Sequence, residues 1–417
     1  MHLSSFLLSS MTPVRAWMVR NWKELSWALI FAAACAVALD YGKDTWRGPG
    51  SFKVYLVGSL EDADIQRVFN SFQKAAEKSR LEINGIPVEF ELKNDLGNPT
   101  VAKRIAQQLV NAPDTLAVIG HVLSQQTKAA IPVYMSATPR IPLIATTETD
   151  DNLLSQCQPC SDGFVPLIQM APTNKAQSES AVKYALEHGR NRFLLVSEVN
   201  GENADYIQNL MSDYNGAVKL YGFKGAIKVG EVSMGAPPSK ESFQYWKPDC
   251  ILYAGEREAA MSLIAAVKSF DAPKGITIIL PDSSVNRDMT NQYQEDPKPN
   301  EIRYTYPSDA YYFRNDLNVF GQDAFALLRD LVSDSDAEPP SITERIHSLI
   351  GMHRISDARN NIISHMSHNA NRGVVYKGQS GDTYKFFGCQ RDGAYFHVWE
   401  VKGSAVLDVD NWHAPKG

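Results

Sequence analysis

Short apolar strands alternate with helices along most of this chain, and this alternation constrains the fold more than any other feature. Residues 53–58 (KVYLVG) predict a buried strand, and 63–80 predict a helix whose apolar residues recur on one face. Strands joined by helices of this length favour a parallel, doubly wound sheet. Further strands are predicted at 87–92, 116–120, 142–145, 192–197, 218–221, 249–253 and 276–280, and further helices at 99–111, 124–135, 176–188, 203–214, 239–246 and 256–270.

The pattern runs through two successive α/β units, and 417 residues suit two domains. We expect two doubly wound (Rossmann-like) lobes. Beyond residue 280 the pattern weakens: 294–315 shows no clear period, and 354–372 reads as a polar insertion rich in His and Asn. Helices are predicted at 321–333 and 341–352, and 394–401 alternates like an edge strand.

The N-terminal segment, 1–45, predicts export. Arg15, Arg20 and Lys23 precede an apolar run over 25–39, whose 15 residues would rise about 22 Å as a helix, short of a hydrocarbon core of about 30 Å. This layout is typical of a signal peptide, and the same run, uncleaved, would act as a membrane anchor. Both readings place the later residues on the periplasmic or extracellular side. A buried core helix is the alternative.

Composition and motifs exclude several functions. Lys plus Arg number 41 against 47 Asp plus Glu, a net charge of −6, so no basic excess favours nucleic acid. The chain lacks G-x-G-x-x-G, G-x-x-x-x-G-K-[ST], H-E-x-x-H and G-x-S-x-G. We therefore expect no enzyme activity and no cofactor, with an enzyme as the contrasting class because two-lobed α/β clefts also host catalysis.

Two histidines and two closely spaced cysteines could indicate a metal or redox site. His365 and His368 would share one helical face, but a solvated polar insertion is the better explanation and we expect no metal. Cys157 and Cys160 (CQPC) have no second CxxC with which to bind zinc. In an oxidising compartment a local disulfide between these two cysteines is the better prediction.

Polar groups follow two of the predicted strands. The strand at 116–120 runs into His121 and on to Ser124, and the strand at 142–145 runs into Thr147 and Thr149. Ligands of open α/β sheets bind beyond the carboxyl ends of strands. Hydroxyl and N–H donors beside a helix N-terminus suit an anion such as a carboxylate. The alternative is structural, with Ser124 an N-cap and the threonines part of a loop.

Over most of the chain beyond residue 51, the sequence resembles the type I periplasmic binding proteins, in particular the branch that binds leucine, isoleucine and valine. The resembling stretches are VYLVG, GIPVEFELKNDLGNPTVAKRIAQQLV, LAVIGHVLSQQTKAAIPVY, IPLIATTETDDNLL, FVPLIQMAPTNKAQSESAVKYAL, FLLVSEVNGENADYI and SFQYWKPDCILYAGEREAAMSLIAAVKSF. The resemblance implies two lobes joined by a hinge that closes over an α-amino acid. We expect a first lobe of 51–165 plus about 288–370, and a second of 166–287 plus about 371–411.

The resemblance also implies ligand contacts. Ser124 would bind the ligand carboxylate, Thr149 its polar end, and the backbone near Thr147 would add a donor. In the second lobe Asp282 stands where the family has a glutamate that pairs with the ligand ammonium.

Two positions depart from the family pattern. Glu256 replaces an aromatic residue, and Asn200 replaces a tyrosine. Two carboxylates at one site favour a more polar or cationic ligand than leucine. Simpler alternatives are that Glu256 only complements a helix dipole and that Asp282 is an N-cap or loop residue.

The expected function is capture of a small amino acid-like ligand for an ABC importer, whose permease would be the partner. The alternatives are an anchored sensor domain with a membrane signalling partner, and a degenerate interaction module without a ligand.

Overall fold

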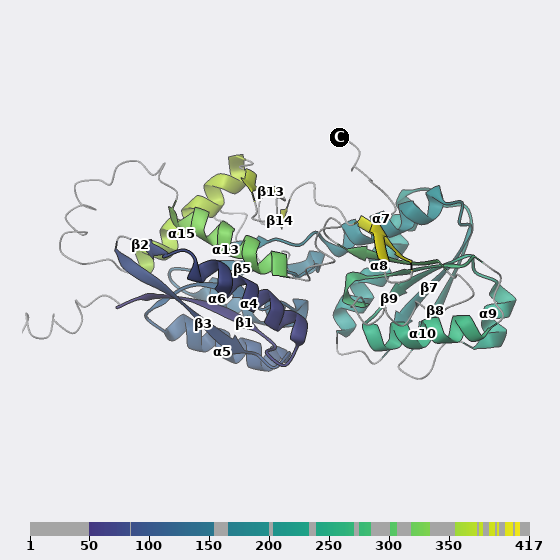
Figure 1. Cartoon of the computed structure of the whole chain (residues 1–417), viewed down its shortest axis with the longest axis horizontal. Coiled ribbons are helices and arrows are strands. Elements are labelled where there is room, and N and C mark those ends of the chain that lie inside the picture. Colours follow the sequence, from purple (N-terminus) through teal and green to yellow (C-terminus); the bar gives the residue numbers. More distant parts are fainter. Residues whose placement is uncertain are drawn as a thin grey trace, which may run out of the picture. The chain divides into compact units, whose positions relative to one another are not determined.

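The computed structural model describes residues 50–83, 85–153, 166–199, 203–232, 239–270, 275–284, 301–306, 318–333, 355–372, 375–377, 383–387, 390–391, 397–402 and 405–408. Within these residues the strands form a nine-stranded sheet and a seven-stranded sheet. Each sheet and the helices packed on it form one lobe of an α/β architecture, as the sequence predicts (Figure 1).

The first lobe is built on the sheet of order β12-β13-β14-β6-β5-β4-β1-β3-β2. Its central strands β3, β1, β4, β5 and β6 run parallel, so their carboxyl ends meet at one edge. The strands are β1 (Phe52–Gly58), β2 (Glu82–Ile83), β3 (Ile86–Asn94), β4 (Thr115–Gly120), β5 (Leu143–Ala145), β6 (Leu167–Gln169), β12 (Val375–Lys377), β13 (Thr383–Phe387) and β14 (Gln390–Arg391).

Helices cover both faces of the first sheet. On one face α4 (Ala63–Glu77), α13 (Asn318–Ser333) and α15 (Ile355–Arg372) bury a core that contains Phe72 and Phe325. On the other face α5 (Pro99–Asn111) and α6 (Ser124–Ser136) bury a second core around Tyr134. In Figure 1, α5 and the pair α13 and α15 lie on opposite sides of β1 and β3. A sheet buried on both faces explains why β1 and β4 read as continuous apolar runs.

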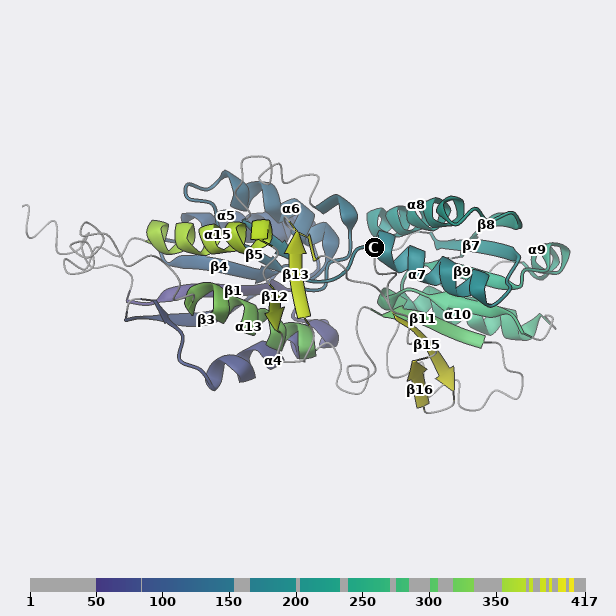
Figure 2. The ribbon, with the colours of Figure 1, turned by 90° about the horizontal axis from the view of Figure 1, so that it is seen from above.

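The second lobe is built on the sheet of order β16-β15-β11-β10-β9-β7-β8. Strands β11, β10, β9, β7 and β8 are parallel, and β15 and β16 add an antiparallel margin beside β11 (Figure 2). The strands are β7 (Arg192–Glu198), β8 (Ala226–Val232), β9 (Cys250–Ala254), β10 (Thr277–Leu280), β11 (Glu301–Tyr306), β15 (His397–Lys402) and β16 (Ala405–Asp408).

Helices also cover both faces of the second sheet. The helices α7 (Asn174–Glu187) and α8 (Ala204–Leu220) bury one core, and α9 (Lys240–Trp246) and α10 (Arg257–Ser269) bury the other (Figure 1). Cys250 is fully buried in β9.

Three predictions about single elements are wrong. The strand predicted at 218–221 is the last turn of α8, because Tyr206, Leu210, Tyr214 and Ala217 continue one buried helical face into it. The strand that follows α8 is β8 (Ala226–Val232). It was missed because its lysine, glycine and glutamate interrupt the apolar pattern expected of a strand. The segment 294–315 contains strand β11, whose alternating EIRYTY was missed.

Within the 354–372 stretch, residues 355–372 form a helix, α15, and not a solvated insertion. Arg359 of α15 donates from Nε to the carbonyl oxygen of Thr115 at 2.6 Å, and His365 Nδ1 lies 2.9 Å from the carbonyl oxygen of Leu331. The apolar side chains of α15 were obscured in the sequence by the polar residues between them. The helix therefore belongs to the first lobe.

Sheet membership differs from the expected lobe ranges at three places. Strand β6 pairs with β5 in the first sheet, so the second lobe begins with α7 and not at residue 166. Strand β11 pairs with β10 in the second sheet, and β12 to β14 belong to the first sheet. The chain therefore passes between the lobes later than expected each time, because the strand that precedes each passage still pairs with its earlier neighbours.

The N-terminal segment 1–45 and the helix predicted at 341–352 lie outside the described residues. Among the helices that the structure describes, none combines the length and the apolar character needed to cross a membrane.

Candidate functional site

Strand β4 ends in a turn that only glycine fits. Gly120 has φ of +117°, and a Cβ there would collide with the carbonyl oxygen of Val57 on the neighbouring strand. Val122 also has a positive φ, of 74°. This tight turn brings the chain from the carboxyl end of β4 directly into α6, so Ser124 is placed at the edge of the sheet.

A buried carboxylate ties this turn to the neighbouring strand. Glu148, which follows β5 and is 1% exposed, accepts hydrogen bonds at Oε1 from the Val122 N–H at 3.0 Å and the Thr127 hydroxyl at 2.7 Å. Its Oε2 accepts the N–H of Thr147 at 2.9 Å. Burial raises the pKa of Glu148, and the hydrogen bonds that it accepts oppose that rise. Glu148 therefore fixes both strand-end loops relative to each other.

The structure brings the predicted first-lobe residues to one edge, with different roles. Ser124 is partly exposed, and its hydroxyl forms no hydrogen bond with another described residue. It is the first residue of α6 and not the predicted N-cap, which is Leu123. Thr147, predicted to offer a backbone donor, gives its N–H to Glu148 and its hydroxyl to the carbonyl oxygen of Val122 at 2.9 Å. Thr149 is 4% exposed, and its carbonyl oxygen accepts the N–H of Asn174 at 2.6 Å.

A buried hydrogen-bonded chain of Asp95, His121 and Tyr134 also stabilises this turn. His121 is fully buried, with Nδ1 3.0 Å from Asp95 Oδ2 and Nε2 3.0 Å from the hydroxyl of Tyr134. The chain from carboxylate through imidazole to phenol joins β3, the turn and α6. It holds the backbone that leads into Ser124.

The second lobe carries three carboxylates at the matching edge of its sheet. Glu198 ends β7, Glu256 follows β9 as the N-cap of α10, and Asp282 follows β10. These strands are consecutive and parallel in the sheet. Glu198 Oε2 accepts the N–H of Glu256 at 2.6 Å and the hydroxyl of Tyr253 at 3.4 Å.

Asp282 is held by neutral donors. Its Oδ1 accepts Gln177 Nε2 at 2.7 Å and the hydroxyl of Tyr206 at 3.3 Å. Burial raises the pKa of this carboxyl group, and the hydrogen bond from Gln177 is the largest opposing influence. The side chain of Glu256 makes no cap hydrogen bond and instead accepts Asn203 Nδ2 at its Oε1.

Asn200, Cys157 and Cys160 lie outside the described residues. His365 contacts Leu331, and the structure describes no side chain for His368. Within the described part of the chain, no group of three or more His, Cys, Asp or Glu side chains has a metal-binding arrangement.

Sequence reasoning missed Glu148, Glu198 and Gln177. Glu148 was visible as the one charged residue in the run Thr146 to Thr149, directly after a strand. Glu198 was visible as a charge at the end of a buried strand. Gln177 gave no signal, because its contact with Asp282 joins residues 105 positions apart.

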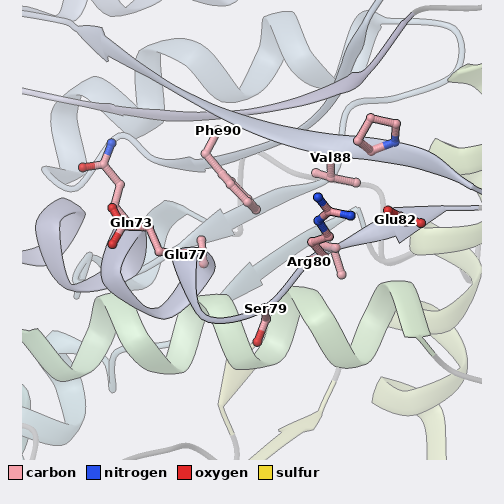
Figure 3. A pocket seen from close by; sticks show the side chains of 10 residues that line it. Gln73, Glu77, Ser79, Arg80, Glu82, Val88 and Phe90 are labelled. Carbon is pink, nitrogen blue, oxygen red and sulfur yellow. The ribbon is translucent and has the colours of Figure 1, made fainter.

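An open cavity of about 630 Å³ lies elsewhere on the first lobe. Figure 3 shows it between the end of α4 and strands β2 and β3, with Glu77, Arg80, Glu82 and Val88 among its lining residues. Val88 pairs with Phe52 at the amino end of the parallel strands, whereas Gly58 pairs with Asn94 at their carboxyl end. The cavity is therefore at the opposite edge from Ser124, where α/β sheets do not usually bind ligands.

Comparison with known proteins agrees with this architecture. Residues 63–318 match the family model described as periplasmic binding protein, so the chain belongs to the periplasmic binding protein family. No curated protein sequence matches the chain.

Solved structures share the two-lobe fold. A leucine-bound ABC transporter substrate-binding protein from Desulfitobacterium hafniense is 14% identical with a TM-score of 0.61, over 86% of this chain and 99% of that one. The leucine binding protein LivK from Thermotoga maritima is 18% identical with a TM-score of 0.60, over 85% and 97%. A solute binding protein from Rhodopseudomonas palustris HaA2 in complex with p-hydroxybenzoic acid is 12% identical with a TM-score of 0.64, over 86% and 95%. The fold is that of the type I periplasmic binding proteins.

Family membership fixes the general class. The family comprises solute-binding proteins and is not a class of enzymes, and it implies a periplasmic or extracellular location.

Proposed function

We propose that this protein captures a small amino acid-like solute outside the cytoplasm and delivers it to an ABC importer. The proposal rests on one observation: the two sheets present hydrogen-bond donors and carboxylates, respectively, at their carboxyl edges. The carboxyl edge of the first sheet presents a hydroxyl beside a helix N-terminus, and the corresponding edge of the second sheet presents carboxylates. An amino acid carries the two complementary groups.

The first-lobe edge suits the ligand carboxylate. Ser124 offers a partly exposed hydroxyl at the first residue of a 13-residue helix, whose N-terminal N–H groups and dipole favour an anion. Thr149 adds a second hydroxyl on the adjacent strand's loop. In this proposal Thr147 shapes the loop through Glu148 and Val122.

The second-lobe edge suits the ligand ammonium. Asp282 and Glu256 are partly exposed carboxylates at neighbouring strand ends. Asn200, two residues beyond the last residue of β7 in the sequence, completes the proposed set of contacts.

In the proposed mechanism the ligand binds to one lobe first, and hinge motion then adds the contacts of the other. The protein carries out no reaction. Leucine and p-hydroxybenzoic acid in the related structures each carry a carboxylate, which supports a carboxylate-bearing ligand here.

Thermal shift and native mass spectrometry of the purified protein test the proposal. A ligand at 100 times its Kd should add about 2.7 kcal/mol to the free energy of unfolding. We expect at least one amino acid or aromatic carboxylate to raise the Tm, and Ser124→Ala to reduce that rise. Ser136→Ala, at the far end of the same helix, is the matched control.

An unchanged Tm with every amino acid and aromatic carboxylate, together with no copurified metabolite, would contradict the proposal. That outcome would favour the degenerate interaction module. Binding by a form that retains its N-terminal apolar segment would favour the anchored sensor.

A further inference from the structure

The carboxyl edge of the second sheet holds more negative charge than one ligand ammonium neutralises. Glu198, Glu256 and Asp282 follow three consecutive parallel strands, and Glu198 and Glu256 are joined directly through the Glu256 N–H. The N-terminus of α10 supplies about half a positive charge. Neither Glu198 nor Asp282 forms an ion pair with a residue that the structure describes.

The groups that contact Asp282 and Glu198 in the described part of the chain are neutral. Asp282 accepts from Gln177 and Tyr206, Glu198 from Tyr253, and Glu256 from Asn203. Amide and phenol donors satisfy oxygen lone pairs without supplying charge. Asp282 and Glu198 therefore gain no neutralising charge from the described residues, and this edge suits a cation.

Gln177 gives an independent indication of missing donors. Its side chain is 0% exposed, and its Nε2 is bound to Asp282 Oδ1. Because a carboxylate only accepts, this contact fixes the amide orientation and leaves Oε1 as an acceptor without a partner among the residues that the structure describes. Asn174, one turn earlier on α7, is also 0% exposed, and among the described residues neither its Oδ1 acceptor nor its Nδ2 donor has a partner. A buried acceptor without a partner is unfavourable, so an N–H donor that reached Gln177 Oε1 would be stabilising.

We propose, resting on the function proposed above, that the ligand is a basic amino acid whose side-chain cation binds among Glu198, Glu256 and Asp282, with Gln177 as a positioning residue for Asp282. The ligand's α-ammonium and side-chain cation together bring two positive charges to three carboxylates. A guanidinium fits best, because its five N–H donors exceed the three of an ammonium and match an edge rich in acceptors.

Isothermal titration of the full chain with L-arginine, L-lysine, L-citrulline and L-norleucine tests the charge requirement. Citrulline keeps the length and planarity of arginine but lacks the charge. Arginine should bind at least about tenfold more tightly than citrulline and norleucine, a difference of about 1.4 kcal/mol. Equal or tighter binding of norleucine or citrulline would overturn the inference.

Leucine and p-hydroxybenzoate in the same titration separate this inference from the function it rests on. Binding of either one without binding of arginine refutes the basic ligand and leaves the solute-binding function standing. Failure of all six compounds removes support from both.

Two variants test where the side-chain cation of the ligand binds. Glu198→Gln and Asp282→Asn should each bring the arginine-to-citrulline affinity ratio toward one. Glu231→Gln, an exposed carboxylate on β8, is the matched control and should leave that ratio unchanged. A ratio unaffected by both site variants would overturn the assignment.

The positioning role of Gln177 has its own readout. Tyr206 and Tyr214 on α8 are the titratable neighbours of Asp282. Without the hydrogen bond from Gln177, Asp282 should take up its proton at a higher pH. In Gln177→Met, arginine binding should therefore be lost at a higher pH than in the wild type, while the Tm without ligand stays within a few degrees. An unshifted pH profile would show that Gln177 is only structural.

Discussion

At the scale of single residues, Glu148 shows how one buried carboxylate can organise a binding edge. It accepts three hydrogen bonds, from Val122, Thr127 and Thr147, and so joins the loops that follow β4 and β5. The hydroxyls of Ser124 and Thr149, on the same two loops, form no hydrogen bond with another described residue.

We predict that Glu148→Gln destabilises the first lobe. A glutamine must turn its NH₂ group toward either Thr147 N–H or the pair of donors at Oε1, so at least one buried donor loses its acceptor. The expected loss is about 1–3 kcal/mol in the free energy of unfolding. Urea denaturation measures it, and Glu231→Gln, which is expected to change stability by less than about 0.5 kcal/mol, is the control. A variant as stable as the wild type would contradict this role.

A second residue-scale prediction concerns pH. Burial, followed by the negative charge of Asp151, raises the pKa of Asp213 from 3.8 to about 7. The folded state thus keeps a proton that the unfolded state releases, and this contribution to stability is lost as pH rises from about 4 to 7. Asp213→Asn lacks that loss, so its stability relative to the wild type should increase across this range and then level off. Urea denaturation at several pH values checks the sign, and a constant difference would refute it.

At the scale of elements, the contact between α4 and α13 depends on one small residue. A Cβ on Gly321 would collide with the carbonyl oxygen of Val68 and the hydroxyl of Ser71, so α13 lies directly against the backbone of α4. Ser71 is already bound to the Val68 carbonyl oxygen at 2.8 Å and cannot easily move away.

We predict opposite effects for two glycine substitutions inside helices. Gly321→Ala should destabilise the protein by about 1–3 kcal/mol through overpacking. Gly216→Ala in α8, where a Cβ meets no atom within 4 Å, should stabilise it by about 0.5–1 kcal/mol. Thermal denaturation of both variants gives the comparison. Equal effects would show that the α4 and α13 packing is not tight.

Prediction from sequence succeeded for elements with a strong period. The bounds of α5 match those expected, and β1, β4 and α10 differ by one or two residues, since each buries a continuous or regularly spaced apolar face. It failed where polar residues interrupt the pattern, as in α15 and β8. For the site, strand ends predicted Ser124 and the family resemblance predicted Glu256 and Asp282, but which donors and acceptors meet depends on contacts between distant residues, such as Gln177 with Asp282.

At the scale of the whole molecule, solute capture implies a change in compactness. If the two proposed half-sites close around one ligand, small-angle X-ray scattering should record a smaller radius of gyration with ligand than without. Ser124→Ala should shift this compaction to higher ligand concentrations, in proportion to its loss of affinity. A radius that does not change at saturating ligand would contradict closure by a hinge.

The order of strands along the chain has one more consequence. Each sheet is assembled from an early segment and a late one: β12 to β14 return to the first sheet, and β15 and β16 to the second. A ribosome must therefore synthesise almost the whole polypeptide before either half is complete. Until then the unfinished margins stay available to chaperones, and no uninterrupted fragment is a good candidate for expression as a stand-alone lobe.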